Sequence, residues 1–384
     1  MIQRDIQKKI LSLSKKFKAV AIVGPRQSGK TTLAKMLFKD KPYISLENID
    51  HRTVAKEDTR RFLKQFPKGA ILDEVQRAPE IFSYLQEILD NSRKNGQFIL
   101  TGSQNFLLQQ DISQSLAGRV AYATLLPLSV KELSAANLLR KDVNDVLWRG
   151  FYPAVYQTRP NPTDWYANYV RTYIERDVRQ IRNIENLSAF GKFMRMCAIN
   201  TGQLLNLSAI GNELGVDQKT VKAWLNVLES SYIIFLLQPY FSNPRKRLVK
   251  TPKLYFYDTG LAAYLLGLRS KKDVSNYYGR GSLFENLVIA EFMKDDFNFG
   301  KHQQFYFWRD KTGNEIDLMA ERGVQPTLIE IKSADTFHPS MLRGISYYTA
   351  LHRSRAKALL IYNGEVNQKL KGNISVTNWR QVEY

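Results

Sequence analysis

The sequence contains a single cysteine, Cys197, among its 384 residues. One cysteine excludes an intramolecular disulfide bond and suits a reducing compartment. None of the four histidines has the spacing of a metal ligand: His51, His302, His338 and His352. These shortages exclude a disulfide scaffold and a zinc site, so the chemistry of this chain must rest on other residue types.

Long hydrophobic runs are also lacking. The apolar stretch SYIIFLL (231–237) is far shorter than the roughly 20 residues of a membrane-spanning helix. The N-terminus carries Asp5 and has no early apolar segment, so it does not resemble a signal peptide. We expect a soluble, cytoplasmic protein without a membrane partner.

Acidic residues are scarce relative to basic ones. The chain has 36 Asp and Glu against 56 Lys and Arg, which gives a net charge of +20 and a pI of about 9.8. Because this surplus recurs along the whole chain, it predicts a polyanionic partner, most commonly nucleic acid. The alternative is a basic surface that binds no polyanion.

The order of apolar runs predicts an α/β protein with four regions. In residues 1–135, short apolar runs alternate with helical segments, which is typical of a parallel sheet with helices on both faces. Residues 136–200 are expected to be helical. Residues 201–250 read as a helix (208–214), a turn at Gly215, a second helix (217–229) and a hairpin, which predicts a winged helix-turn-helix. Residues 251–384 are expected to form a mixed α/β domain.

The first region contains a phosphate-binding motif. GPRQSGKT (24–31) matches GxxxxGK[ST], follows an apolar strand and opens a helix. Glycines let the backbone wrap around phosphate, Lys30 supplies a cation to the β- and γ-phosphates, and Thr31 offers its hydroxyl to Mg²⁺. The motif predicts ATP and Mg²⁺ as cofactors, bound by Gly24, Pro25, Arg26, Gln27, Ser28, Gly29, Lys30, Thr31 and Thr32.

Two acidic residues complete this predicted site. The apolar strand in GAILDEVQ (69–76) ends in Asp73 and Glu74. Asp73 is placed to hold Mg²⁺ and its water shell, and Glu74 to orient or deprotonate the attacking water. A glutamate directly after the aspartate favours hydrolysis over simple binding.

Two further residues are candidates for catalysis. The strand QFILTGSQN (97–105) ends in Ser103 and Gln104, of which we favour Ser103 as a polar sensor of the γ-phosphate; the alternative is a plain strand-end turn. Arg119 in SLAGR (115–119) follows a predicted helix and is a candidate arginine finger toward a neighbouring subunit. A cation that complements the helix dipole is nearly as good an interpretation of Arg119.

The motifs GPRQSGKT, ILDEVQ, TGSQ, LAGR, GFYP (150–153) and YIERDV (173–178) together resemble those of prokaryotic AAA-type ATPases with a C-terminal restriction-nuclease-like domain of unknown function. The resemblance covers nearly the whole chain. It implies an ATPase core, a winged helix and a nuclease-like C-terminal domain that acts on nucleic acid. It also favours Arg119 as a finger and gives weight to Arg176 and Asp177, without assigning them a role.

The last region carries acidic residues and a lysine in a suggestive order. Glu285 lies on a predicted helix, Asp317 on a strand, and Glu330 and Lys332 share one face of the next strand because side chains alternate along a strand. This pattern resembles the core of restriction-type nucleases, where carboxylates hold Mg²⁺ and the lysine assists the attacking water. The alternative is ordinary polar alternation on a half-exposed sheet.

The predicted helix-turn-helix provides candidate DNA contacts. The spacing of Val221, Trp224, Leu225 and Leu228 predicts that they form the core face of the second helix. The exposed face, and the basic run after the hairpin, would contact DNA through Gln218, Lys219, Lys222, Arg245, Lys246 and Arg247.

Three functions are therefore open. We favour an Mg²⁺-dependent ATPase, assembled as a homo-oligomer or ring, whose nucleotide state is coupled to its grip on branched or single-stranded DNA. The second is an ATP-gated, metal-dependent DNA nuclease. The third is a nucleotide-switched scaffold whose winged helix binds a protein.

Overall fold

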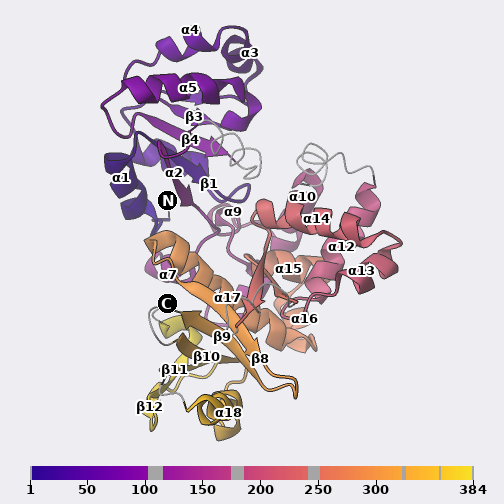
Figure 1. Ribbon diagram of the computed structural model, residues 1–384. Coiled ribbons are helices and arrows are strands. Elements are labelled where there is room, and N and C mark those ends of the chain that lie inside the picture. The colour runs from indigo at the N-terminus through magenta and orange to yellow at the C-terminus, as the bar shows by residue number, and fades with distance from the viewer. Residues whose placement is uncertain are drawn as a thin grey trace. The chain divides into compact units, whose positions relative to one another are not determined.

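The computed structural model of the chain describes residues 2–102, 116–173, 186–240, 251–321, 326–353 and 356–382 (Figure 1). They form two compact units. The first comprises Met1–Leu128 with Ser230–Tyr232 and Phe297–Gly300, and the second comprises Ser129–Glu229, Ile233–Asp296 and Lys301–Tyr384. The boundary expected at residue 135 falls within the second unit, at the end of its first helix.

The first unit is a parallel sheet with helices packed against it. Its strands are β1 (Ala19–Val23), β2 (Tyr43–Ser45), β3 (Ile71–Asp73), β4 (Phe98–Gly102) and β5 (Val120–Thr124), in the order β2-β3-β4-β1-β5 with every pair parallel. Its helices are α1 (Gln7–Lys16), α2 (Lys30–Leu37), α3 (Ile49–Glu57), α4 (Thr59–Lys64), the 3₁₀ turn η1 (Val75–Arg77) and α5 (Glu80–Asn91). The predicted parallel α/β core is confirmed.

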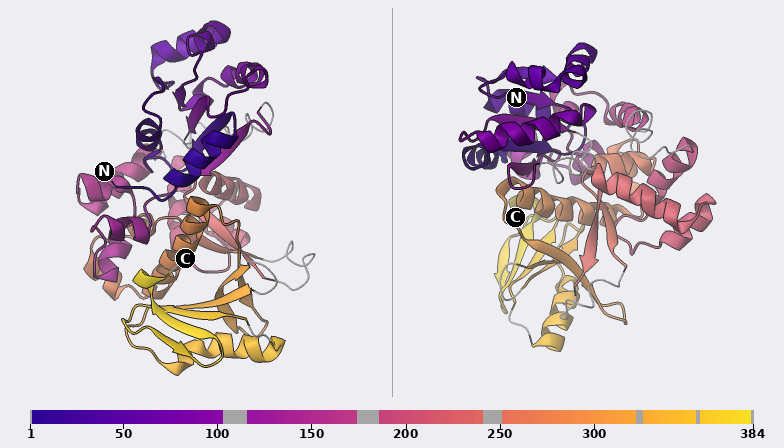
Figure 2. Two further views of the ribbon diagram at one scale, coloured as in Figure 1. Left: turned by 90° about the vertical axis from the view of Figure 1, so that its left-hand side faces the viewer. Right: turned by 45° about the horizontal axis from the view of Figure 1, so that its top comes forward.

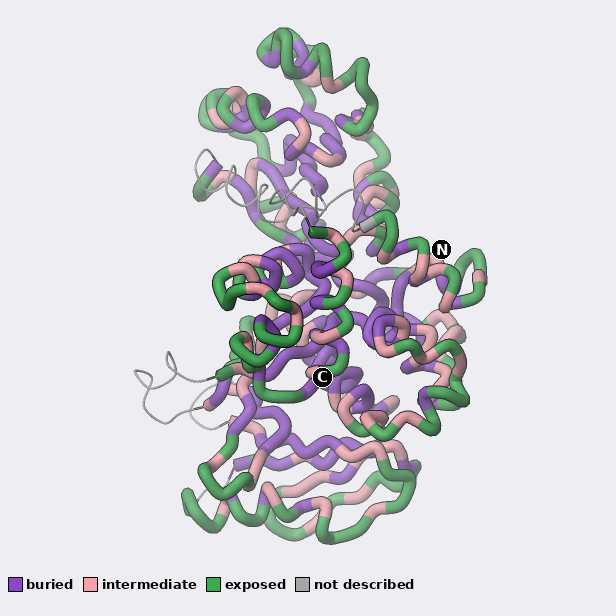
Figure 3. The backbone as a smooth tube through the Cα atoms, turned by 90° about the vertical axis from the view of Figure 1, so that its right-hand side faces the viewer, coloured by how far each residue is buried: buried purple, intermediate pink, exposed green. Residues whose placement is uncertain are grey.

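Burial explains why β1 lies inside this sheet. All five residues of its AVAIV run are buried, as expected of a parallel strand covered on both faces. Around it, Ile6, Val20, Ile22 and Leu33 share one apolar core, and buried positions follow the strands in Figure 3. Because these strands are parallel, the C-terminal ends of β1, β3 and β4 lie at one edge of the sheet, where ligands of such sheets bind.

The second unit begins with helices. They are α7 (Val130–Ala135), α8 (Val143–Arg149), α9 (Pro153–Gln157), α10 (Pro162–Tyr173), α12 (Leu187–Ile199), α13 (Leu207–Leu214), α14 (Gln218–Ser230), α15 (Thr259–Leu265), α16 (Lys271–Asn276) and α17 (Arg280–Phe299). No helix in the described ranges is both long and apolar enough to cross a lipid bilayer.

The helix pair α13–α14 matches the two helices expected there. Gly215 ends α13 in the left-handed region, with φ of 68°. Val221, Trp224, Leu225 and Leu228 are buried, which confirms the predicted core face. Trp224 packs against two phenylalanines of α12, with both ring centroids 5.6 Å away.

The second unit ends in a mixed, eight-stranded sheet of order β12-β13-β11-β10-β9-β8-β6-β7 (Figure 2). Its strands are β6 (Ile234–Pro239), β7 (Lys253–Phe256), β8 (Gln304–Arg309), β9 (Glu315–Glu321), β10 (Pro326–Lys332), β11 (Ala358–Tyr362), β12 (Gln368–Leu370) and β13 (Ile374–Asn378), with η4 (Pro339–Leu342), α18 (Arg343–His352) and η5 (Trp379–Gln381). The strand pair after α14 is part of this sheet, because β6 pairs antiparallel with β7 and parallel with β8. The boundary placed at residue 250 thus lies between two strands of one sheet.

The GFYP motif has a structural explanation. The buried carboxylate of Asp258 accepts hydrogen bonds from the Phe151 amide (2.6 Å), the Tyr166 hydroxyl (2.7 Å) and the Leu261 amide (2.7 Å). A Cβ on Gly150 would lie 2.6 Å from this carboxylate. The glycine therefore lets the loop before α9 pack directly onto the start of α15.

Candidate functional site

The glycine-containing loop 24–29 follows β1 and depends on its two glycines. Gly24 has φ of 143°, and a Cβ there would lie 2.2 Å from the carbonyl oxygen of Leu125, so a side chain has no room. Gly29 has φ of 96° and begins α2. The loop therefore takes a path that L-residues rarely adopt and turns its backbone toward the start of a helix.

The polar groups of the loop fit an anion. The Lys30 ammonium donates to the carbonyls of Gly24 (3.0 Å) and Pro25 (2.8 Å), which holds it over the loop. Ser28 is fully buried, and its hydroxyl has no hydrogen-bond partner within the described part of the chain. Arg4 donates to the Ser28 carbonyl (2.8 Å) and braces the loop. A buried cation and an unsatisfied hydroxyl suit a phosphate group.

Asp73 lies at the C-terminal end of β3 and is surrounded by hydroxyl donors. Its Oδ1 accepts from Thr31 (2.9 Å) and Thr101, and its Oδ2 accepts from Tyr43 (2.7 Å). Thr31 at the start of α2 and Thr101 near the end of β4 lie at the same sheet edge as Asp73. Tyr43 instead reaches Asp73 from the first residue of the neighbouring strand β2. Burial and the Asp73 carboxylate raise the pKa of Tyr43 well above its usual value, so its hydroxyl remains a donor. Asp73 is thus held as an oriented acceptor beside Thr31.

Glu74 directly follows Asp73, and its backbone turns away from the direction of β3. Its backbone lies in the left-handed region, with φ of 55° and ψ of 47°, where η1 begins. That conformation is costly for a residue with a side chain and is often found at functional sites. The Gln76 amide donates to the Glu74 carboxylate and fixes its direction.

The other residues predicted for this site have separate surroundings. The Arg26 guanidinium lies 3.9 Å from the Glu47 carboxylate, which partly neutralises it. Arg119 makes a two-pronged ion pair with Asp90 of α5, with contacts of 2.5 and 2.8 Å. Thr32 is exposed and Gln27 has φ of 60°. Ser103, the predicted sensor, lies outside the described residues, as do Arg176 and Asp177.

Sequence reasoning missed Tyr43 and Thr101. Thr101 lies near the end of the apolar strand FILTG, whereas Tyr43 is the first residue of the strand YIS. That signal was used for Ser103 but equally pointed to Thr101, two positions earlier. Arg4 has no comparable signal, since it reaches the loop from before α1.

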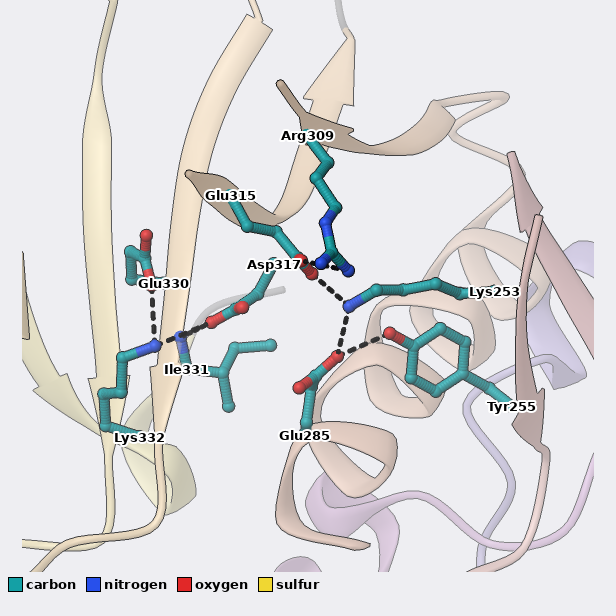
Figure 4. Close-up of polar contacts among 9 residues, drawn as sticks. All are labelled: Lys253, Tyr255, Glu285, Arg309, Glu315, Asp317, Glu330, Ile331 and Lys332. Atoms are coloured by element: carbon teal, nitrogen blue, oxygen red, sulfur yellow. Dashed lines mark hydrogen bonds and ion pairs between the residues drawn. The ribbon is translucent and has the colours of Figure 1, made fainter. Parts of the chain in front are cut away.

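The C-terminal residues predicted from spacing come together in part (Figure 4). Lys332 donates to Glu330 Oε2 at 2.8 Å and to Asp317 Oδ2 at 3.2 Å. Asp317 also accepts the Ile331 amide at 2.7 Å. β9 and β10 are antiparallel neighbours, and this pairing brings Asp317 beside the Glu-x-Lys strand.

Glu285 on α17 adjoins these residues, and burial, and then the charge of Asp317, raise its pKa. Lys253 of β7 donates to Glu285 Oε1 at 3.3 Å and also contacts Glu315, while the Tyr255 hydroxyl donates to Glu285 at 2.5 Å (Figure 4). Lys253 is buried, and although burial lowers its pKa, the nearby carboxylates outweigh burial and raise it. The sequence suggested Lys253 as part of the basic run after the hairpin that would contact DNA phosphates; that interpretation is wrong, because Lys253 begins β7 and is buried among carboxylates.

The C-terminal carboxylates are paired with lysines as they are arranged. Among the described residues, no group of three or more His, Cys, Asp or Glu side chains could hold a metal ion. Lysines take the central positions instead, and Glu330 Oε1 is so close to α18 that a Cβ on Gly344 would lie 2.0 Å from it. Burial, and then the charge of Asp317, raise the pKa of Glu330 to about 9.

The expected DNA-contacting side chains of α14 are exposed: Gln218, Lys219 and Lys222. They lie on the face opposite the buried Trp224. Arg245, Lys246 and Arg247 lie outside the described residues.

Family models account for most of the chain. Residues 16–134 match an AAA domain, residues 140–272 a domain of unknown function (DUF8612), and residues 280–382 a domain of unknown function (DUF4143). Two segments of the chain thus match known domain models, an AAA domain and, toward the C-terminus, DUF4143. This confirms the family resemblance carried by the motifs, with the loop, Asp73 and Glu74 in the AAA domain and Glu285, Asp317, Glu330 and Lys332 in the DUF4143 domain.

Curated relatives match most of the chain. The uncharacterized protein Rv2008c of Mycobacterium tuberculosis is 29% identical over 94% of this chain and 80% of its own length. The uncharacterized protein MJ1544 of Methanocaldococcus jannaschii is 24% identical over 83% and 75% of the two chains.

Solved structures show more distant similarity to the AAA-type chain. The Walker-type ATPase PABY2304 of Pyrococcus abyssi is 15% identical, with a TM-score of 0.46 over 69% of this chain and 96% of that one. The Aeropyrum pernix ORC2 protein in its ADP form is 16% identical, with a TM-score of 0.33 over 71% and 90%. At these TM-scores the similarities add nothing to the assignment made by the family models.

Proposed function

We propose that the protein is an Mg²⁺-dependent ATP hydrolase that binds DNA. The contact between Thr31 and Asp73 carries the proposal. It lies where the loop that contains Gly24 and Gly29 leads into α2. Thr31 and Asp73 supply the two oxygens expected around a nucleotide-bound Mg²⁺. The AAA family model over this segment supports a nucleotide site.

Each residue has a role in this proposal. Lys30 leaves the loop carbonyls to bind the β- and γ-phosphates, and the loop amides with the start of α2 bind phosphate oxygens. Thr31 and Asp73 hold Mg²⁺, which neutralises charge on the phosphates when bound. Glu74, held by Gln76, orients the attacking water and takes its proton.

The test is ATP turnover of the purified full chain with ATP binding measured in parallel. Glu74→Gln should lower kcat by at least about a hundredfold while ATP still binds, since general-base catalysis contributes roughly 10²–10⁴-fold. Lys30→Ala should abolish binding as well. The exposed α5 carboxylate variant Glu80→Gln is the matched control and should behave as wild type. Equal turnover of Glu74→Gln and wild type would refute the hydrolytic role.

DNA binding rests on charge and on α14. The net charge of +20 and the exposed Lys219 and Lys222 provide phosphate contacts on one helix. Duplex binding should weaken steeply with salt, and a double Lys219→Ala, Lys222→Ala variant should flatten the salt slope by about 1.8, or about 0.9 per contact. The control removes two exposed lysines of the first unit, Lys56 and Lys64. Salt-independent binding would contradict the electrostatic basis.

A second candidate is ATP-gated DNA cleavage by the DUF4143 domain. The convergence of Asp317, Glu330 and Lys332 supports it, whereas the lysine-neutralised arrangement disfavours it. Incubation of plasmid and branched DNA with Mg²⁺ or Mn²⁺ decides the question. Cleavage that Glu330→Ala abolishes would establish the nuclease. If the wild type cleaves no DNA with either metal, the nuclease is excluded and only the proposed ATPase function stands.

A further inference from the structure

An exposed pair of tyrosines precedes the DUF4143 helix α17. Tyr278 is 91% exposed, the highest among the large apolar and aromatic side chains described, and its ring centroid lies 4.8 Å from that of Tyr277. Single exposed apolar side chains are common on protein surfaces, so the meaning of this ring depends on the residues next to it. The pair follows α16 and joins it to α17.

The partner ring is fixed in place. Tyr277 is half-buried, and a Cβ on Gly279 would lie 2.6 Å from its ring, so the glycine lets the ring lie against the backbone. Burial, and then the neighbouring Tyr278, raise the pKa of Tyr277 to about 12, which keeps its hydroxyl neutral. The ring of Tyr278 therefore packs against a neutral Tyr277 ring that is held in place by the backbone.

The segment that carries the tyrosines is rich in basic residues. Residues 269–280, RSKKDVSNYYGR, contain four basic residues and one acidic residue, a net charge of +3. Lys271 and Lys272 on α16 and Arg269 before it are exposed. Aromatic rings flanked by cations are the combination that binds unpaired nucleic acid, in which bases stack on the rings and phosphates meet the cations.

The residues that directly follow the tyrosine pair contact the end of the strand that carries Glu330 and Lys332. Arg280, two residues after Tyr278, donates to the carbonyl of Ser333 at 3.0 Å, directly after β10. A Cβ on Gly281 would lie 3.9 Å from the Ser333 hydroxyl. A chain bound at Tyr278 would therefore run close to the end of β10.

We propose that Tyr277 and Tyr278, with Lys271 and Lys272, form a base-stacking site for an unpaired polynucleotide, DNA or RNA. The inference deepens the nucleic-acid-binding part of the proposed function and is independent of ATP hydrolysis. It requires an unpaired strand, because the bases of a duplex are stacked on each other and offer no free face. The site is separate from the exposed face of α14, which is suited to a duplex.

The experiment measures binding of the full chain to labelled oligo-dT, oligo-rU and a duplex, each of about 20 nucleotides or pairs, by fluorescence anisotropy over a salt series. Tyr278→Ala should weaken binding of the unpaired oligonucleotides by at least about fivefold, without a change in salt slope. Tyr278→Trp should retain or strengthen it. The double Lys271→Ala, Lys272→Ala variant should instead reduce the slope by about 1.4. Oligo-dT and oligo-rU distinguish DNA from RNA as the preferred strand.

The controls separate this site from the rest of the protein. Ile49→Ala removes another exposed apolar side chain, 67% exposed on α3, and should change nothing. Wild-type affinity of Tyr278→Ala for both oligonucleotides, or an equal loss in Tyr278→Trp, would overturn the stacking site. If the wild type binds duplex but no oligonucleotide, this inference fails and DNA binding stands; if it binds neither, both fail. ATP turnover of Tyr278→Ala should match wild type in every case.

Discussion

The Thr31 hydroxyl donates to Asp73 Oδ1 across 2.9 Å, although the two residues are 42 positions apart in the chain. The contact joins the start of α2 to the end of β3. It also places two oxygen ligands of the hard-cation type side by side, at the edge of the sheet where the glycine loop opens. The metal-binding part of the proposed site is therefore pre-organised by hydrogen bonds.

The hydroxyl groups that donate to Asp73 should affect the Mg²⁺ concentration needed for ATP turnover. Asp73→Asn removes a ligand charge and should lower kcat by at least about a hundredfold, since a metal supplies several kcal/mol to such reactions. Thr101→Val leaves the carboxylate but deletes one donor, and a lost hydrogen bond to a charged group is worth about 1.5–3 kcal/mol. We expect a raised Mg²⁺ half-saturation in Thr101→Val, measured by titrating Mg²⁺ at saturating ATP. The same Mg²⁺ dependence in wild type and Asp73→Asn would contradict the assignment.

The loop should not tolerate a side chain at Gly24. Gly24→Ala would place a Cβ 2.2 Å from the Leu125 carbonyl and force φ away from 143°. We expect loss of ATP binding and a lower melting temperature. Gly372→Ala is the matched control, because Gly372 also has positive φ (81°) but open space around it. If both variants lose the same small amount of stability and still bind ATP, the close approach of Leu125 to the loop is not important for either property.

Arg119 is paired within its own chain, so a finger role requires that pair to open. The hydrogen bond from Arg119 lowers the pKa of Asp90, which stays ionised at neutral pH. Exposed pairs of this kind contribute little to stability, so the pair can be exchanged for a nucleotide. Arg119→Ala should reduce kcat by at least about tenfold without weakening ATP binding, and Asp90→Ala should not reduce it. Turnover that is unchanged in Arg119→Ala removes the finger, and with it this argument for a homo-oligomer or ring.

The raised pKa of Glu330 makes stability depend on pH. Its folded-state pKa of about 9 lies above the roughly 4.3 of an unfolded glutamate. Between these values the folded chain binds the extra proton, so this group's contribution to stability is complete at low pH and is lost as pH rises. Glu330→Gln should therefore gain stability relative to wild type from about pH 5 to about pH 8, by at most about 1.4 kcal/mol per pH unit.

Urea unfolding at several pH values measures this difference. Lys332 does not confuse the comparison, because nearby carboxylates outweigh burial and raise its pKa, so it stays charged throughout. The exposed Glu365→Gln variant should show no pH-dependent difference from wild type. A constant difference between Glu330→Gln and wild type across the range would show that Glu330 does not titrate there.

Much of the first unit could be predicted from the chain alone. The predictable features are local patterns: the loop glycines, the lysine and threonine that follow them, and the acids at the end of an apolar run. Local backbone preferences determine the structure that each of these patterns forms. The same holds for the buried face of α14, where helical periodicity selects Val221 and Trp224. The Glu-x-Lys strand is equally local, because alternation along a strand sets which side chains share a face.

Tertiary structure decided the partners of these residues. Tyr43 and Thr101 meet Asp73 only because strand order places β2, β3 and β4 together, and no periodicity encodes strand order. Lys253 reaches Glu285 because β7 joins the C-terminal sheet through β6, across a boundary that the sequence seemed to mark. Such charges are placed by packing between distant segments. The buried Lys253 and the partly exposed Lys332 pair with carboxylates that local spacing had presented as metal ligands.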